Sequence, residues 1–207
     1  MHPNPVYRGA PDAQNLQFAA RRGFGTLALN GVDGLPLLAH VPFVIEGDRV
    51  LFHLVRSNPI ARRIKTALPG KLSVLGGDSY VSPDWYGLDD QVPTWNYVAV
   101  HLSGPVALLP QDQMRDILER LSDRFEAALA PKPIWKTAKM PDDVLARMMP
   151  QIVPCAMEIT DIQGTWKLAQ NKPEAARLAA ADGVETDGIG AELAVLAGLM
   201  RDPPAQG

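Results

Sequence analysis

The stretch RSNPIARR, residues 56–63, combines residue types that can bind a phosphate group. It joins the end of a predicted strand to the start of a predicted helix, where free backbone N–H groups and the helix dipole attract an anion. Arg56, the Ser57 hydroxyl at the helix cap, and Arg62 or Arg63 one turn on could together hold the phosphate. An ordinary capped helix with charges on its solvated face explains the same residues, and spacing alone favours that interpretation.

A second candidate lies in residues 79–106, where a loop rich in aromatic side chains leads into a predicted strand that starts at Thr94. In Trp95 and Asn96, an aromatic ring that can stack and exclude water stands next to an amide that can satisfy polar atoms at a ligand's edge. This chemistry suits a flat ligand with polar edges. Surface packing of a long hairpin is the alternative, and composition alone favours it.

Trp166, Lys167, Gln170 and Asn171 follow directly after the last predicted strand. A charged lysine and two amides beside a tryptophan could reach a ligand, and they could equally close one end of a barrel. The residue types do not separate these two roles.

The histidines offer a third type of site, because His40, His53 and His101 all lie in predicted strands and three such ligands could hold zinc. They are far apart in the sequence, and no cysteine pair accompanies them. A hydrogen-bonded histidine that lines a pocket is the favoured interpretation of each, and no metal site is predicted. No Gly-x-Ser-x-Gly elbow is present, and no side chain stands out as a general acid or base, so the catalytic residues stay unassigned.

The elements that must position these residues are mostly strands joined by tight turns, such as the one marked by Asn30-Gly31 and Asp33-Gly34. The predicted strands are 23–30, 35–45 (broken by Pro36 and Pro42), 49–55, 71–76, 94–102 with an extension to 109, and 154–163. The predicted helices are 11–22, 57–67, 111–129 and 142–149, with one or two more from Glu174 and disorder in the last residues. This order favours a mainly β fold with helices (α+β), an antiparallel barrel rather than a doubly wound sheet.

Composition sets outer limits on function. The chain has 207 residues, of which 46% are hydrophobic, so it can build a substantial core. A formal charge of −3 gives no global basic field that would drive nucleic-acid binding. Cys155 stands alone and is expected to be a buried thiol in a reducing compartment. No apolar run approaches the length of a membrane span and the N-terminus lacks a signal-peptide pattern, so we expect a cytoplasmic protein without membrane contact.

Four stretches together resemble the PaiB-type FMN-binding proteins, a family often described as negative transcriptional regulators. They are LLAHVPFVI (37–45), FHLVRSNPIAR (52–62), YVSPDWY with VPTWNYVAVHLSG (80–104), and GTWKLAQNKPEA (164–175). The resemblance covers about Tyr7 to Ala181. One departure is Ala169, where the family pattern has a serine, and this puts one hydrogen bond in doubt.

The resemblance implies the antiparallel FMN-binding split β-barrel, which is similar to the folds of pyridoxamine-phosphate oxidases and flavin reductases. In that fold two subunits form a homodimer with FMN in the groove between them. We therefore expect one split-barrel domain over residues 1–181 and a helical tail over residues 182–207. The residues predicted to bind FMN are His40, Val41, His53, Arg56, Ser57, Arg62, Trp95, Asn96, Trp166, Lys167 and Gln170.

The resemblance leaves three functions open: a flavin-dependent oxidoreductase, a flavin-binding negative transcriptional regulator without redox turnover, and a split barrel that binds haem or another ligand. The first would use a nicotinamide or another small-molecule substrate. For the second, we expect no direct binding to DNA, because the chain is acidic and shows no helix-turn-helix with a basic reading face.

Overall fold

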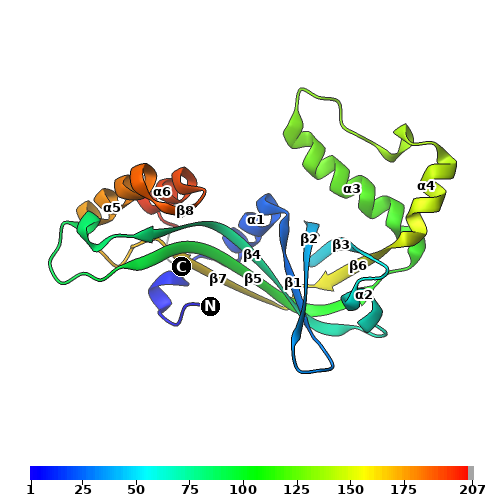
Figure 1. The fold of residues 1–207 in the computed structure, drawn as a ribbon, viewed down its shortest axis with the longest axis horizontal. Coiled ribbons are helices and arrows are strands. Elements are labelled where there is room, and N and C mark those ends of the chain that lie inside the picture. The colour runs from blue at the N-terminus through cyan, green and yellow to red at the C-terminus, as the bar shows by residue number, and fades with distance from the viewer. Residues whose placement is uncertain (205–207) are drawn as a thin grey trace. The chain divides into compact units, whose positions relative to one another are not determined.

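The computed structural model describes residues 1–204, which divide into two compact units. The barrel unit comprises Ala20–Ser73 and Leu102–Asp161. The terminal unit comprises Met1–Ala19, Val74–His101 and the chain from Ile162 onward. The boundary predicted between residues 181 and 182 falls inside helix α5, Glu174–Asp187. Figure 1 labels the helices and strands in chain order.

Antiparallel strands build the barrel unit. β1 (Phe24–Asn30) pairs with β2 (Pro36–Glu46), β2 pairs with β3 (Arg49–Val55), and β3 pairs with β6 (Ile152–Glu158). Parts of two long strands complete it, because β4 (Leu68–Val81) pairs with β1 and β5 (Thr94–Leu108) pairs with β6. A further pairing of β5 with β4 turns this series into a ring of strands. The predicted antiparallel, mainly β fold with helices is therefore confirmed.

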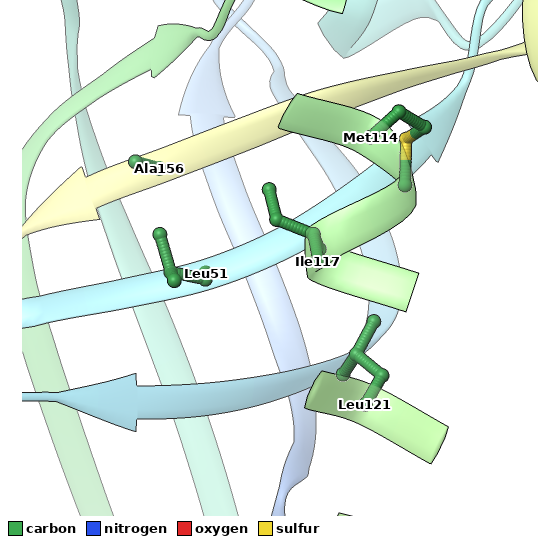
Figure 2. Packing of buried hydrophobic residues seen from close by; sticks show 5 residues of the cluster. All are labelled: Leu51, Met114, Ile117, Leu121 and Ala156. Atoms are coloured by element: carbon green, nitrogen blue, oxygen red, sulfur yellow. The ribbon is translucent and has the colours of Figure 1, made fainter. Parts of the chain in front are cut away.

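Buried side chains at alternate positions of the strands fill the interior of the ring. In β3, Val50, Phe52 and Leu54 are buried, while the residues between them point to the other face. On that other face the helix α3 (Met114–Glu126) adds a second apolar layer. Figure 2 shows its side chains directed toward β3 and β6, in a buried cluster of Leu51, Met114, Ile117, Leu121 and Ala156. Apolar residues at helical spacing on one side of α3 explain why this helix is covered on one face only.

The terminal unit is organised by contacts between the two ends of the chain. Helix α1 (Asp12–Arg22) carries the buried Asn15, whose Oδ1 accepts a hydrogen bond of 2.8 Å from Nε1 of Trp166 on β7 (Asp161–Lys167). Gly164 allows this approach, because a Cβ there would lie 2.1 Å from Oδ1 of Asn15. α5 packs beside α6 (Leu193–Arg201), and the short strand β8 (Ile189–Ala191) pairs with β4 (Figure 1).

Short elements connect these strands and helices. The α-helices among them are α2 (Pro59–Arg63) and α4 (Asp142–Met148). The 3-10 turns are η1 (Pro5–Tyr7), η2 (Pro83–Tyr86), η3 (Gln111–Gln113), η4 (Ala127–Leu129), η5 (Thr137–Lys139) and η6 (Met149–Gln151).

Four predicted elements are corrected. The helix expected over 57–67 is α2 alone, because the backbone turns extended at Ile64, whose side chain is buried. The strand expected over 71–76 is the much longer β4. The strand expected over 154–163 is two strands, since Ile159 and Thr160 donate their N–H groups to Asp48 and Ser103 and turn the chain. β2 is continuous through Pro42, because Phe43 resumes the ladder with a hydrogen bond to Gly23.

The chain from Glu174 onward contains the helices α5 and α6, as predicted, with the unpredicted strand β8 between them. The disorder expected for the last residues falls on 205–207, outside the residues that the structure describes.

Candidate functional site

The turn from β3 into α2 differs in one respect from the sequence prediction. Asn58 caps the helix, with its Oδ1 accepting from the N–H of Ile60 at 2.8 Å, so the cap assigned to Ser57 is wrong. A cap at Asn58 places Pro59 in the first turn, where its missing N–H costs nothing. Ser57 is therefore exposed with its hydroxyl free of the capping role. α2 packs against β2, the strand that holds His40 and Val41.

The Arg56 side chain is hydrogen-bonded to neighbouring segments of the barrel unit. Its Nε donates to the carbonyl of Pro150 at 2.6 Å, and its Nη2 donates to Oε1 of Gln111 at 2.7 Å and to the carbonyl of Ile152 at 3.4 Å. These acceptors belong to the segments that lead into β6 and α3. Arg56 thus ties three stretches of the barrel unit together, a role that its sequence neighbourhood did not indicate. Its predicted contact with a phosphate stays a prediction.

The arginines of α2 are placed differently. Arg62 is exposed, and its backbone N–H bonds to the carbonyl of Asn58. Arg63 has its Nε atom buried with no hydrogen-bond partner among residues 1–204. Buried donors are nearly always paired in folded proteins, so an unpaired guanidinium N–H indicates that a partner is still to be supplied.

Two histidines lie on neighbouring strands of the barrel unit. His40 on β2 is exposed, and its Nδ1 lies 2.9 Å from Oγ1 of Thr26 on β1, whereas the neighbouring Val41 is buried. His53 on β3 has a buried Nδ1 without a partner in the described chain. Burial lowers the pKa of His53, so its imidazole is neutral and offers an unpaired nitrogen.

The remaining predicted residues belong to the terminal unit. Trp95 is 46% exposed and meets Tyr80 edge to face, with 6.4 Å between the ring centroids. It lines a hollow of about 260 Å³ together with Gly76 and Tyr97. Its predicted position beside a flavin ring stays a prediction.

Trp166 and Gln170 hold the N-terminal segment in place. The indole of Trp166 is buried against α1 through its bond to Asn15. Gln170 accepts from the N–H of Leu168 at 2.8 Å and donates to the carbonyl of Val6 at 3.2 Å. Both side chains therefore tie the N-terminal segment to the chain around β7, and their predicted contact with FMN stays a prediction.

Lys167 and Asn96 line one small cavity, of about 290 Å³. Three further residues around it, Tyr7, Tyr86 and Lys172, were not predicted to belong to a site. Burial raises the pKa of Tyr86 to about 12, with a smaller contribution from Tyr7, and burial lowers the pKa of Lys167. The tyrosine and lysine types were visible in the sequence, but only the folded chain brings residues 7, 86, 96, 167 and 172 together.

The predicted residues thus fall into two groups. His40, Val41, His53, Arg56, Ser57 and Arg62 belong to the barrel unit, and Trp95, Asn96, Trp166, Lys167 and Gln170 belong to the terminal unit. Within residues 1–204, no three histidine, cysteine, aspartate or glutamate side chains gather as metal ligands. In the same range, no helix has the length and apolar character needed to cross a membrane.

A family model described as a putative FMN-binding domain matches residues 1–161. The chain belongs to this family. A curated relative, the protease synthase and sporulation protein PAI 2 of Bacillus subtilis, is 28% identical over 175 residues, which cover 82% of this chain and 83% of the relative. This match confirms the resemblance to PaiB-type proteins.

Solved structures share the fold at low sequence identity. A conserved hypothetical protein from Mycobacterium tuberculosis has a TM-score of 0.58 at 14% identity, with 81% of this chain and 92% of that chain covered. The FAD and heme binding protein from Mycobacterium smegmatis has a TM-score of 0.57 at 18% identity, with 78% and 73% covered. The strand ring and these likenesses confirm the split-barrel fold, and the family match supports FMN as the cofactor.

Proposed function

We propose that this chain is a flavin-dependent oxidoreductase that holds FMN on its barrel unit and acts as a homodimer. The observation that carries the FMN assignment is the α2 turn, where Arg63 keeps a buried, unpaired guanidinium N–H next to the exposed Arg62. Ser57 adds an exposed hydroxyl at the start of the same turn. Guanidinium groups bind a phosphate dianion through strong charge-assisted hydrogen bonds, and a hydroxyl can add a further donor.

The donor set at the end of β3 fits FMN. Ser57 and Arg62 supply donors for the phosphate, and Arg63 supplies a further N–H that has no partner within the described chain. His53, held neutral by burial, offers a nitrogen to a polar edge of the ligand. Arg56 contributes indirectly, since its bonds to Pro150 and Gln111 fix the turn from which Ser57 projects.

β2 supplies the wall for the ring system. Val41 fixes the strand by its buried side chain, and His40 is oriented by its contact with Thr26. FMN, when bound, supplies hydride and electron transfer, so the chain needs only to bind it, orient it and limit access of water. No described side chain is assigned as an acid or base, and the catalytic residues stay unassigned.

The homodimer is supported by apolar side chains that the barrel unit leaves uncovered. Phe24, Leu38 and Val55, on the neighbouring strands β1, β2 and β3, are 55%, 60% and 56% exposed. Clustered exposed apolar residues of this kind mark a surface that another chain covers. A second copy would cover them with the same surface in a twofold arrangement.

The names of similar proteins agree with redox use of this fold. Besides the FAD and heme binding protein, a flavocytochrome, Anf3 of Azotobacter vinelandii, has a TM-score of 0.56 at 13% identity, with 80% of this chain and 72% of that chain covered. The name of the Bacillus subtilis relative instead refers to protease synthesis and sporulation. A regulator without redox turnover is therefore the alternative function.

Anaerobic reduction separates the two functions. FMN-loaded protein is mixed with NADH or NADPH, and the loss of flavin absorbance is followed over time. An oxidoreductase is expected to reduce bound FMN faster than the same concentration of free FMN is reduced, because the protein orients both reactants. If neither NADH nor NADPH reduces bound FMN faster than free FMN, nicotinamide turnover is rejected and the regulator remains, even if binding of FMN is tight.

A further inference from the structure

The cavity of about 290 Å³ in the terminal unit contains two lysines with neutral partners only. Nζ of Lys167 donates to Oγ1 of Thr94, and Nζ of Lys172 donates to Oε1 of Gln91. Neither ammonium pairs with a carboxylate within the part of the chain that the structure describes. Two ammonium groups therefore line a cavity whose lining has one carboxylate, that of the exposed Asp90, among the described residues.

A buried amide faces the same space. Asn96 is 1% exposed, its Nδ2 lies 3.5 Å from Sδ of Met200, and its Oδ1 has no hydrogen-bond partner in the described chain. Asn96 and Thr94 share one face of β5, because alternate residues of a strand point to the same side. The amide therefore lies on the side where Thr94 meets Lys167. A buried acceptor of this kind requires a donor, and a ligand in the cavity can supply it.

Aromatic rings form the walls. Nζ of Lys167 lies 6.0 Å from the ring centroid of Tyr7, and Nζ of Lys172 lies 5.3 Å from that of Tyr86. The rings hold the ammonium groups and offer apolar surface to the body of a ligand. The other charged or titratable side chains in the described lining are Asp90, which is exposed, and His2, whose pKa is lowered by burial and by Lys167.

We propose that this cavity binds a small organic acid whose carboxylate is held by Lys167 and Lys172 and whose hydroxyl or amino group donates to Oδ1 of Asn96. The assignment replaces the predicted contact of Asn96 and Lys167 with FMN. Its reason is size, since the cavity of about 290 Å³ lies just below the range of about 300–1,000 Å³ found for ligand pockets. The proposal stands without the flavin function.

Three probes of nearly equal size test the recognition of charge and donor. Lactate has both groups, propionate lacks the hydroxyl, and methyl lactate lacks the charge. Binding to the full-length protein, with and without saturating FMN, is followed by NMR shifts of the amides of residues 90–96 and 167–172. We expect lactate to bind about three- to tenfold more tightly than propionate and at least about tenfold more tightly than methyl lactate, as loss of one neutral or one charged hydrogen bond predicts.

Matched lysine variants locate the site. Lys167→Met is expected to weaken lactate binding about tenfold or more, because a charge-assisted bond is lost. Lys65→Met, at an exposed lysine of the barrel unit, is expected to leave it unchanged. Equal binding of lactate and methyl lactate, or equal effects of the two variants, would overturn the proposal. Tighter binding of inorganic phosphate than of lactate would overturn the choice of a carboxylate.

Discussion

Arg56 of the barrel unit and the two cavity lysines of the terminal unit are used in opposite ways. In the barrel unit, the Arg56 guanidinium is directed at the carbonyls of Pro150 and Ile152 and at Gln111, so it joins three segments. In the terminal unit, Lys167 and Lys172 each bond to one neutral side chain beside a cavity. A planar group with several fixed donors suits the first task, and a compact point charge suits the second.

The difference teaches that the partner of a cation indicates its role better than its exposure does. Arg56 is exposed, yet its N–H groups donate to main-chain and amide oxygens, and these hydrogen bonds hold loops together. Lys167 is half-buried, yet its ammonium donates to a threonine hydroxyl. Arg62 is exposed on α2 beside Arg63, which makes it a barrel-unit cation that a ligand can recruit.

The largest expected effect concerns Arg62. Arg62→Ala should weaken FMN binding about tenfold to a hundredfold, because a charge-assisted hydrogen bond contributes roughly 1.5–3 kcal/mol and 1.4 kcal/mol is a factor of ten. Riboflavin, which lacks the phosphate, should bind the variant as it binds the wild type. Quenching of flavin fluorescence measures both affinities.

Arg115→Ala is the matched control for this experiment. Arg115 is an exposed arginine on α3, also in the barrel unit, and its loss should change neither affinity. If Arg62→Ala weakens FMN and riboflavin equally, the phosphate lies elsewhere and α2 is an ordinary solvated turn. If neither ligand is affected, Arg62 is not a ligand residue.

Local patterns in the sequence predicted the strands of the barrel well. β3 runs over Arg49–Val55, as expected, because alternation and the turn residues before it are local signals. β4 was predicted too short, since Gly76 and Gly77 interrupt the apolar alternation. Its last residues are strand because they pair with β8, as in Ser79 opposite Gly190, and that partner lies far along the chain.

The helix α2 was predicted too long, which is the opposite of the error made for β4. Ile60 and Ile64 recur at helical spacing, but the backbone leaves the helix at Ile64, whose side chain is buried. Tertiary packing thus overrides a local period. The cavity of the terminal unit was missed for a related reason: its N-terminal wall is placed by distant bonds, such as that from the N–H of His2 to Oγ1 of Thr165 at 3.1 Å.

A stability measurement sharpens the contrast between Arg56 and Arg62. Arg56→Ala should lower the free energy of unfolding by about 1 kcal/mol, less than the roughly 1.5–3 kcal/mol of a fully buried charged hydrogen bond, because the side chain is exposed. Arg62→Ala should stay within about 0.5 kcal/mol of the wild type, as surface substitutions do. Urea unfolding measures both. Unchanged stability of Arg56→Ala, together with weaker FMN binding, would make Arg56 a ligand residue and remove the contrast.

The smallest expected effect is a titration in the terminal unit. Burial lowers the pKa of Lys167, because desolvation penalises its charged form. As pH rises, its ε-CH₂ resonance should therefore shift at a lower pH than that of an unperturbed lysine, whose pKa is about 10.4. Thr94→Val removes the hydroxyl that accepts from the ammonium, so it should lower this pKa further. Lactate should raise it, since a bound carboxylate favours the charged form. A Lys167 midpoint that neither change moves would mean that its ammonium points to solvent, and the two units would then differ less than their hydrogen bonds indicate.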